Sequence, residues 1–265
     1  MNRSFLYRVR AAILVAGILL VAAPDGSARI TRSRPSASSG TKPSLLTPFY
    51  SLVIGGGVEW QRDREQTEWG FPILLEYNFT EQLKLTIEPA YKSIRAHTPG
   101  GRSVSGWGDL ETTVDYEFLR ERRYRPALSL EGAIRWPTAE DPDLGERGRD
   151  YTLGLIASKD FVFLEVDANV LYTFLADRER EDLIEVSLAA AWHLNGYVDL
   201  IAEVVHVMRT GGRGAAVDED RDETEATVGV AWIVSKFLKL EQGVVFKEHG
   251  VWEAVFAWEW SIGGD

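Results

Sequence analysis

Apolar and polar residues alternate along most of this chain, and this alternation limits the folds open to it. In residues 126–137, one face carries Leu128, Leu130, Ile134 and Trp136 and the other carries Ser129, Glu131 and Arg135. Residues 161–174 alternate in the same way. Because successive side chains of a β-strand point to opposite faces, each segment predicts a strand with one apolar wall and one polar wall.

About twelve segments follow this rule. They are 50–61, 69–79, 83–95, 108–118, 126–137, 151–158, 161–174, 183–194, 197–208, 224–234, 237–247 and 251–262. Most are close to the roughly 9–11 residues that a tilted transmembrane strand needs, whereas strands of soluble proteins have about 5–6. A bilayer offers no water to an open sheet edge. The sequence therefore predicts an all-β protein, a closed up-and-down antiparallel transmembrane β-barrel of about twelve strands.

Connections between the predicted strands alternate between long and short. The longer ones are 61–68, 96–105, 138–150, 176–182 and 210–223. The shorter ones are 80–82, 159–160, 195–196 and 235–236, with a somewhat longer turn at 119–125 and a short final loop at 248–250. Outer-membrane barrels have long outer loops and tight periplasmic turns, so we expect both ends of the barrel strands on the periplasmic side.

Aromatic residues gather near the ends of the predicted strands. Trp60 and Trp136 would lie at the outer rim, and Trp192 and Trp258 at the periplasmic rim. Amphipathic rings prefer the two membrane interfaces, so this placement agrees with a barrel that spans a membrane.

The first residues predict a secretory signal peptide. Three arginines precede an apolar run at 11–23, which is shorter than the roughly 20 residues of a spanning helix. An uncleaved inner-membrane anchor is the alternative. The predicted division is a signal peptide at 1–28, a disordered linker rich in Ser and Pro at 29–48, the barrel at 49–262 and a tail at 263–265. The expected location is the outer membrane of a Gram-negative-type bacterium.

The amino-acid composition excludes some classes of partner and chemistry. The net charge of −11 argues against a nucleic-acid partner. The chain has no cysteine, which excludes disulfides and thiolate chemistry. The expected partners are outer-membrane lipid and lipopolysaccharide, the barrel assembly machinery and small solutes. The sequence leaves the oligomeric state open.

The polar face of the predicted strands is unusually acidic. The residues expected to line the lumen are Glu88, Glu111, Asp115, Glu131, Arg135, Glu165, Asp167, Glu185, Asp199 and Glu203. A water-filled lumen lined in this way concentrates cations and discourages anions. The alternative is a plugged interior in which these carboxylates pair with basic residues, because about twelve strands lie between packed small barrels and open porins.

Catalytic and metal-binding constellations are poor, so we expect neither an enzyme nor a cofactor nor a metal. Ser187 and His193 share a face but lie six residues apart, or about 20 Å along a strand. The acidic runs at 140–143 and 218–223 could hold calcium but are typical of solvated loops. Pro72 and Pro89 fall inside predicted strands, and we expect a β-bulge at each.

A few short motifs resemble the outer-membrane barrel family named for the meta-pathway of phenol degradation. They are Gly106-Trp107-Gly108-Asp109-Leu110, then Tyr116, then Trp136-Pro137-Thr138, and Gly148 to Lys159 with Asp150 and Gly154. The resemblance implies an outer-membrane transporter or channel, often for aromatic or other hydrophobic compounds. Two departures are Ala139, where the family often has glycine, and a C-terminus that does not end on an aromatic residue.

These motif residues also have a physical interpretation. Gly106 and Gly108 are expected to turn the chain from an outer loop into a strand, and Asp109 to cap the turn by accepting bonds from nearby backbone amides. Pro137 completes the predicted structural motif. A structural role is favoured over substrate contact.

The residues and the resemblance together predict an outer-membrane channel or uptake transporter for small solutes, aromatic or hydrophobic ones included, with an acidic lumen. The main alternative is a closed barrel that acts as a structural or interaction scaffold in the outer membrane. A soluble periplasmic β-protein is a further alternative, which requires the aromatic face to be buried inside the fold.

Overall fold

The computed structural model describes residues 51–63, 65–98, 100–146, 148–175, 181–210, 222–248 and 251–263. The predicted signal peptide, the predicted linker and the last two residues of the predicted tail lie outside this set and stay predictions. In the described part of the chain, no helix is long and apolar enough to cross a membrane.

The described residues form fourteen β-strands. They are β1 (Leu52–Arg62), β2 (Gln66–Asn78), β3 (Leu83–Glu88), β4 (Ala90–Ala96), β5 (Val104–Trp107), β6 (Leu110–Leu119), β7 (Ala127–Trp136), β8 (Asp150–Phe161), β9 (Leu164–Phe174), β10 (Asp182–His193), β11 (Val198–Thr210), β12 (Glu223–Ile233), β13 (Leu238–Phe246) and β14 (Trp252–Ile262). β3 and β4 are halves of one crossing, interrupted at Pro89. β5 and β6 are halves of another, so the fourteen strands make twelve crossings.

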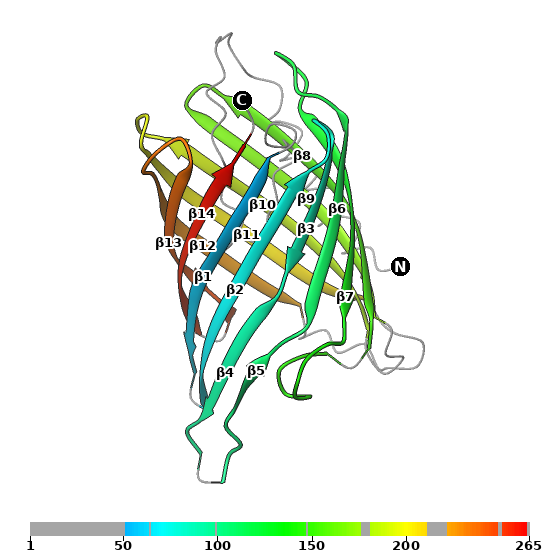
Figure 1. Ribbon diagram of the computed structural model, residues 1–265, viewed down its shortest axis with the longest axis vertical. Helices are drawn as coiled ribbons and strands as arrows, with labels where there is room; N and C mark the ends of the chain where they lie inside the picture. The colour runs from blue at the N-terminus through cyan, green and yellow to red at the C-terminus, as the bar shows by residue number, and fades with distance from the viewer. Residues whose placement is uncertain are drawn as a thin grey trace.

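The sheet closes on itself. β1 pairs antiparallel with β2 on one side and with β14 on the other, and the β1–β14 ladder runs without a break from Leu52–Ile262 to Arg62–Trp252. Figure 1 shows tilted strands around a single barrel, with β4 and β5 projecting from one end. The predicted closed, up-and-down antiparallel barrel of about twelve strands is confirmed.

Burial follows the alternation seen in the sequence. On β7, Ser129 and Glu131 are 1 % and 3 % exposed, whereas Leu130 between them is 52 % exposed. The same contrast separates Asp167 from Val170 on β9. Buried polar side chains and exposed apolar side chains invert the usual pattern of a soluble protein. The apolar face is therefore the outer surface of the barrel, as a lipid environment requires.

Aromatic rings cluster at both ends of the apolar face. At the long-loop end, the ring of Trp60 lies 5.0 Å from that of Trp252 and 6.2 Å from that of Trp69, measured between centroids. At the opposite end, Trp258 and Trp260 project from β14 and are 37 % and 47 % exposed. Rings at these two levels fit the two interfaces of a membrane.

Two predicted connections are wrong. The long loop expected at 61–68 is reduced to residues 63–65, because β1 continues to Arg62 and β2 begins at Gln66. The turn expected at Lys159-Asp160 lies instead at 162–163, because the β8–β9 ladder continues as far as the pair Phe161–Leu164. Lys159 is not a turn residue: its Nζ donates to Oε1 of Glu121 at 2.6 Å, in the neighbouring β6–β7 turn. This bond holds the end of β8 in the sheet.

The bulges expected at Pro72 and Pro89 do not occur at those residues, because the register of β2 with β3 and β4 is the same before and after both prolines. The extra residue lies one strand away. From the pair Glu88–Glu111 to the pair Tyr91–Trp107, the β3–β4 crossing advances three residues and the β5–β6 crossing four. A bulge between β5 and β6 therefore places both Gly108 and Asp109 toward the interior.

Candidate functional site

The interior surface carries the ten residues predicted to line a lumen. Six of them are buried, with at most 9 % of their surface exposed: Asp115, Glu131, Glu165, Asp167, Asp199 and Glu203. The other four are half-buried: Glu88, Glu111, Arg135 and Glu185. All six buried ones lie in the half of their strand that is nearer the short turn. Their part in conducting solutes stays a prediction.

Ion pairs fill the short-turn half of the interior. Nζ of Lys84 on β3 lies 3.4 Å from Oε2 of Glu76 and 3.3 Å from Oδ2 of Asp115, so one ammonium group links β2 and β6. Nζ of Lys239 lies 2.5 Å from Oε1 of Glu241, and both side chains are almost fully buried. Charges this deep need partners, because removing them from water is unfavourable.

Two pairs of carboxylates face each other directly across neighbouring strands. Glu88 on β3 is in register with Glu111 on β6, and Asp115 on β6 is in register with Glu131 on β7. Like charges directly opposite each other in a sheet are destabilising. The barrel therefore gathers negative charge along β3, β6 and β7, and Lys84 and Arg135 offset part of it.

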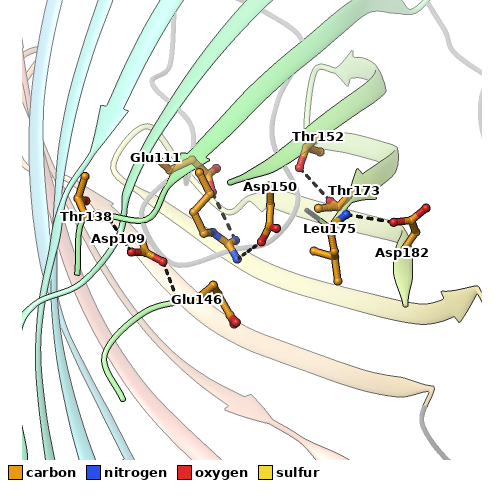
Figure 2. Close-up of polar contacts among 10 residues, drawn as sticks. Asp109, Glu111, Thr138, Glu146, Asp150, Thr152, Thr173, Leu175 and Asp182 are labelled. Atoms are coloured by element: carbon orange, nitrogen blue, oxygen red, sulfur yellow. Dashed lines mark hydrogen bonds and ion pairs between the residues drawn. The ribbon is translucent and has the colours of Figure 1, made fainter. Parts of the chain in front are cut away.

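Arg135 partly offsets this charge nearer the long-loop end. Its guanidinium lies 3.5 Å from Oε2 of Glu111 and 3.9 Å from Oδ2 of Asp150. Figure 2 labels both carboxylates. Asp150 is 2 % exposed and was not predicted as a site residue. The sequence pattern placed it at the end of a loop, and only the pairing of β7 with β8 brings it beside Arg135.

The described residues between β7 and β8, 137–146 and 148–149, fold back onto the barrel; we refer to them as the mouth segment. Asp109 holds it: Oδ1 accepts hydrogen bonds from the backbone N–H groups of Thr138 and Ala139, each at 3.0 Å, and Oδ2 accepts one from Glu146 at 2.6 Å. Figure 2 shows Asp109 between Thr138 and Glu146. Asp109 thus caps amides that lie 29 to 37 residues later in the chain, not those of its own turn.

The two motif glycines make room for the mouth segment. Gly106 and Gly108 lie in and just after β5 on its buried face, and neither turns the chain at a loop end. Leu144 packs against them and is 2 % exposed. A Cβ atom on Gly106 would lie 3.1 Å from Cδ1 of Leu144, and one on Gly108 would lie 3.1 Å from the Leu144 carbonyl oxygen. Pro137 is the exposed first residue of the segment.

A cavity of about 580 Å³ lies between the mouth segment and the barrel wall. Its wall residues are Gln66, Glu68, Glu88, Ala90, Lys92, Ile94, Asp109, Glu111 and Arg135, and the mouth segment contributes Asp143, Leu144, Gly145 and Glu146. Most of these side chains are charged or polar. The cavity is therefore a polar vestibule at the long-loop end, large enough for a small solute.

No protein-family model matches the sequence, and no curated protein matches it. Among solved structures, the COG4313 outer membrane channel from Pseudomonas putida F1 has a TM-score of 0.71 at 13 % identity, covering 86 % of this chain and 100 % of that chain. The KdgM porin has a TM-score of 0.57 at 10 % identity, with 80 % of this chain and 99 % of that chain covered. The NanC porin has a TM-score of 0.56 at 9 % identity, with 79 % and 98 % covered.

These similarities concern the fold. At 9 to 13 % identity they show that the chain adopts a barrel fold found in outer-membrane channels and porins. Membership of the family named for the meta-pathway of phenol degradation stays a prediction.

Proposed function

We propose that this protein is an outer-membrane channel for small solutes, and that its acidic interior favours cations and uncharged molecules over anions. The observation that carries this proposal is the row of carboxylates along β3, β6 and β7, in which Glu88 faces Glu111 and Asp115 faces Glu131. Two carboxylates directly opposite each other in a sheet repel, although Lys84 and Arg135 offset part of this charge. Concentrating cations in a passage is a function that uses these carboxylates.

The vestibule and the fold support the same proposal. The vestibule connects the long-loop end of the barrel to this row of carboxylates, because Glu88 and Glu111 belong to the wall of the vestibule. The expected location in the outer membrane, with lipid, lipopolysaccharide and the barrel assembly machinery as partners, belongs to the proposal too. Aromatic or hydrophobic solutes are the class that the motif resemblance suggests.

Planar-bilayer recordings test the electrostatic part. Under a KCl gradient, we expect the reversal potential to indicate cation preference at about 0.1 M salt and a smaller preference near 1 M, since the screening length falls from about 10 Å to about 3 Å. The double variant Glu88→Gln with Glu111→Gln should reduce the preference, because it removes two half-buried interior carboxylates.

Glu65→Gln is the matched control, because this glutamate lies exposed outside the barrel in the β1–β2 connection. It should leave the reversal potential unchanged. Anion selectivity in the unmodified protein, or equal effects of the control and the double variant, would contradict the electrostatic claim.

The dense burial of charge in the short-turn half supports a second candidate, a closed barrel that acts as a scaffold. The side chains of Lys84, Asp115 and Glu241 are 8 %, 4 % and 3 % exposed, values expected of packed polar networks. Liposome swelling separates the two candidates. Flux of small sugars and amino acids through folded protein supports the channel, and folded protein that admits none of them supports the scaffold.

A further inference from the structure

The mouth segment is held by an unusually concentrated set of contacts. The Asp109 carboxylate accepts three backbone hydrogen bonds from it, at Thr138, Ala139 and Glu146. Bonds from backbone amides to a carboxylate are stronger than those between neutral groups. Both ends of the segment are therefore fixed to one side chain, which projects from the bulge between β5 and β6.

Backbone bonds extend this attachment along the wall of the barrel. The backbone N–H of Glu140 donates to the carbonyl oxygen of Trp107 at 3.0 Å, and the Glu140 carboxylate accepts from the Trp107 N–H at 3.2 Å. Oγ1 of Thr138 accepts from the backbone N–H of Leu110 at 2.9 Å. These bonds satisfy backbone groups of the β5–β6 crossing where the bulge interrupts its regular ladder.

Close packing leaves the segment no room for larger side chains at its contact points. A Cβ atom on Gly106 would collide with the carboxylate of Glu140, and one on Gly145 would lie 2.6 Å from Oδ1 of Asp109. Glycines therefore lie on both sides of the contact between the mouth segment and the β5–β6 crossing. This close packing exists only while the segment keeps its present position.

Contacts on the outer side of the segment are weaker. Arg102, in the β4–β5 connection, pairs with Asp141 and with Asp143, the latter at 2.9 Å. The Arg102 side chain is 62 % exposed, and exposed ion pairs contribute little. Of the described side chains, Asp109 is thus the one that accepts the largest number of hydrogen bonds from the segment.

We propose that Asp109 is a positioning residue that holds the mouth segment over the vestibule, and that the segment sets the size limit for solutes that enter the barrel. The inference rests on the proposed channel function and assigns the size selection to one segment. Residues 143–146 form one side of the 580 Å³ cavity, and the other wall residues in the described part of the chain belong to strands of the barrel or to the bulge between β5 and β6. Moving residues 143–146 away therefore widens the cavity.

Limited proteolysis tests the position of the segment without reference to transport. In Asp109→Ala, we expect thermolysin, which cuts before leucine, to cleave at Leu144 at least about tenfold faster than in the unmodified protein, where this residue is 2 % exposed, because three charge-assisted bonds are lost. Gly106→Val should have the same effect by displacing Leu144 and Glu140 while leaving Asp109 intact. Asp63→Ala is the matched control, since Asp63 accepts two backbone bonds at 2.7 Å within its own turn.

A disulfide supplies the reverse experiment. Cβ of Glu140 would lie 3.5 Å from a Cβ on residue 106, within the range that a disulfide spans, and the chain has no other cysteine. Gly106→Cys with Glu140→Cys in the Asp109→Ala background should restore resistance to thermolysin at Leu144 when oxidised and lose it when reduced. Liposome-swelling rates for a series of sugars should depend on the state of the disulfide in the same way. Larger sugars should enter only when the segment is free.

The outcomes separate this inference from the proposed function. Cleavage of Asp109→Ala at the unmodified rate overturns the role of Asp109, whether or not the protein conducts. Faster cleavage with an unchanged size limit, in a protein that admits small sugars, overturns the role of the segment in size selection. Faster cleavage in a protein that admits no solute supports the role of Asp109 in holding the segment, but it overturns both the size-selection role and the channel function.

Discussion

Replacing Lys84 with methionine is expected to lower the free energy of unfolding by about 3–5 kcal/mol. Lys84 is the cation between Glu76 and Asp115, and all three side chains are at most 10 % exposed. Without it, two carboxylates remain close together in a poorly hydrated space, and Asp115 still faces Glu131 across the β6–β7 ladder. The measurement is urea-induced unfolding in phospholipid vesicles, followed by tryptophan fluorescence.

Two further variants make this result interpretable. Adding Glu76→Gln and Asp115→Asn to Lys84→Met should recover most of the loss, because replacing a whole buried ion cluster by neutral groups is often close to neutral. Lys236→Met, at an exposed turn, should change stability little. A loss below about 1 kcal/mol for Lys84→Met would mean that water reaches the cluster, as it reaches exposed ion pairs. That result would contradict the burial of the Lys84 side chain, which is 8 % exposed.

The two faces of the barrel could be predicted from the sequence because the signal is local. A residue two positions along a strand returns to the same wall, so the alternation of Ser129, Leu130 and Glu131 already separates interior from exterior. The long and short connections then indicate the up-and-down order. None of this requires knowledge of contacts between distant segments.

The mouth segment could not be predicted in the same way. Asp109 reaches it only because a bulge adds one residue between β5 and β6, which turns Gly108 and Asp109 to the interior in succession. The bulge faces Pro89 on the neighbouring crossing, and nothing in the local pattern around residue 109 indicates it. The motif resemblance singled out Gly106, Gly108 and Asp109, but their contacts depend on register.

The misplaced turn has a different cause. Lys159-Asp160 has the polar character of a turn in water, whereas the actual turn contains Val162 and Phe163, which are 69 % and 56 % exposed. Turn residues are usually polar because turns usually meet water. At the edge of a membrane, an exposed apolar turn is acceptable because amphipathic and apolar groups are favoured there.

A second large effect is expected at the seam that closes the barrel. Gly57 lies on β1 between β14 and β2, and a Cβ atom at this position would lie 2.8 Å from the carbonyl oxygen of Phe256. The neighbouring atom belongs to the backbone, so the contact cannot be relieved by turning a side chain. Gly57→Val should therefore push β14 away from β1, with a loss of at least about 1–3 kcal/mol.

The position of Gly57 makes this loss of folding stability harder to compensate by other contacts of β1. Pairs between β1 and β2 stop at Gly56–Ile73 and resume at Glu59–Gly70, beside Pro72, which has no N–H to donate. The continuous ladder to β14 is therefore the main attachment of β1 at this level. If that ladder opens, the backbone N–H and C=O groups along the edges of two strands are exposed to lipid. Each such group without a hydrogen-bond partner there raises the free energy of the folded barrel.

Folding yield measures the effect, because folded and unfolded barrels differ in electrophoretic mobility before and after heating. Gly132→Val is the matched control: it introduces the same side chain on β7, where a Cβ atom meets nothing within 4 Å. The control should fold as well as the unmodified protein, since valine favours strands. Equal yields for the two variants would contradict the seam argument, because closure would then tolerate a wider gap between β1 and β14 than the backbone contact at Gly57 allows.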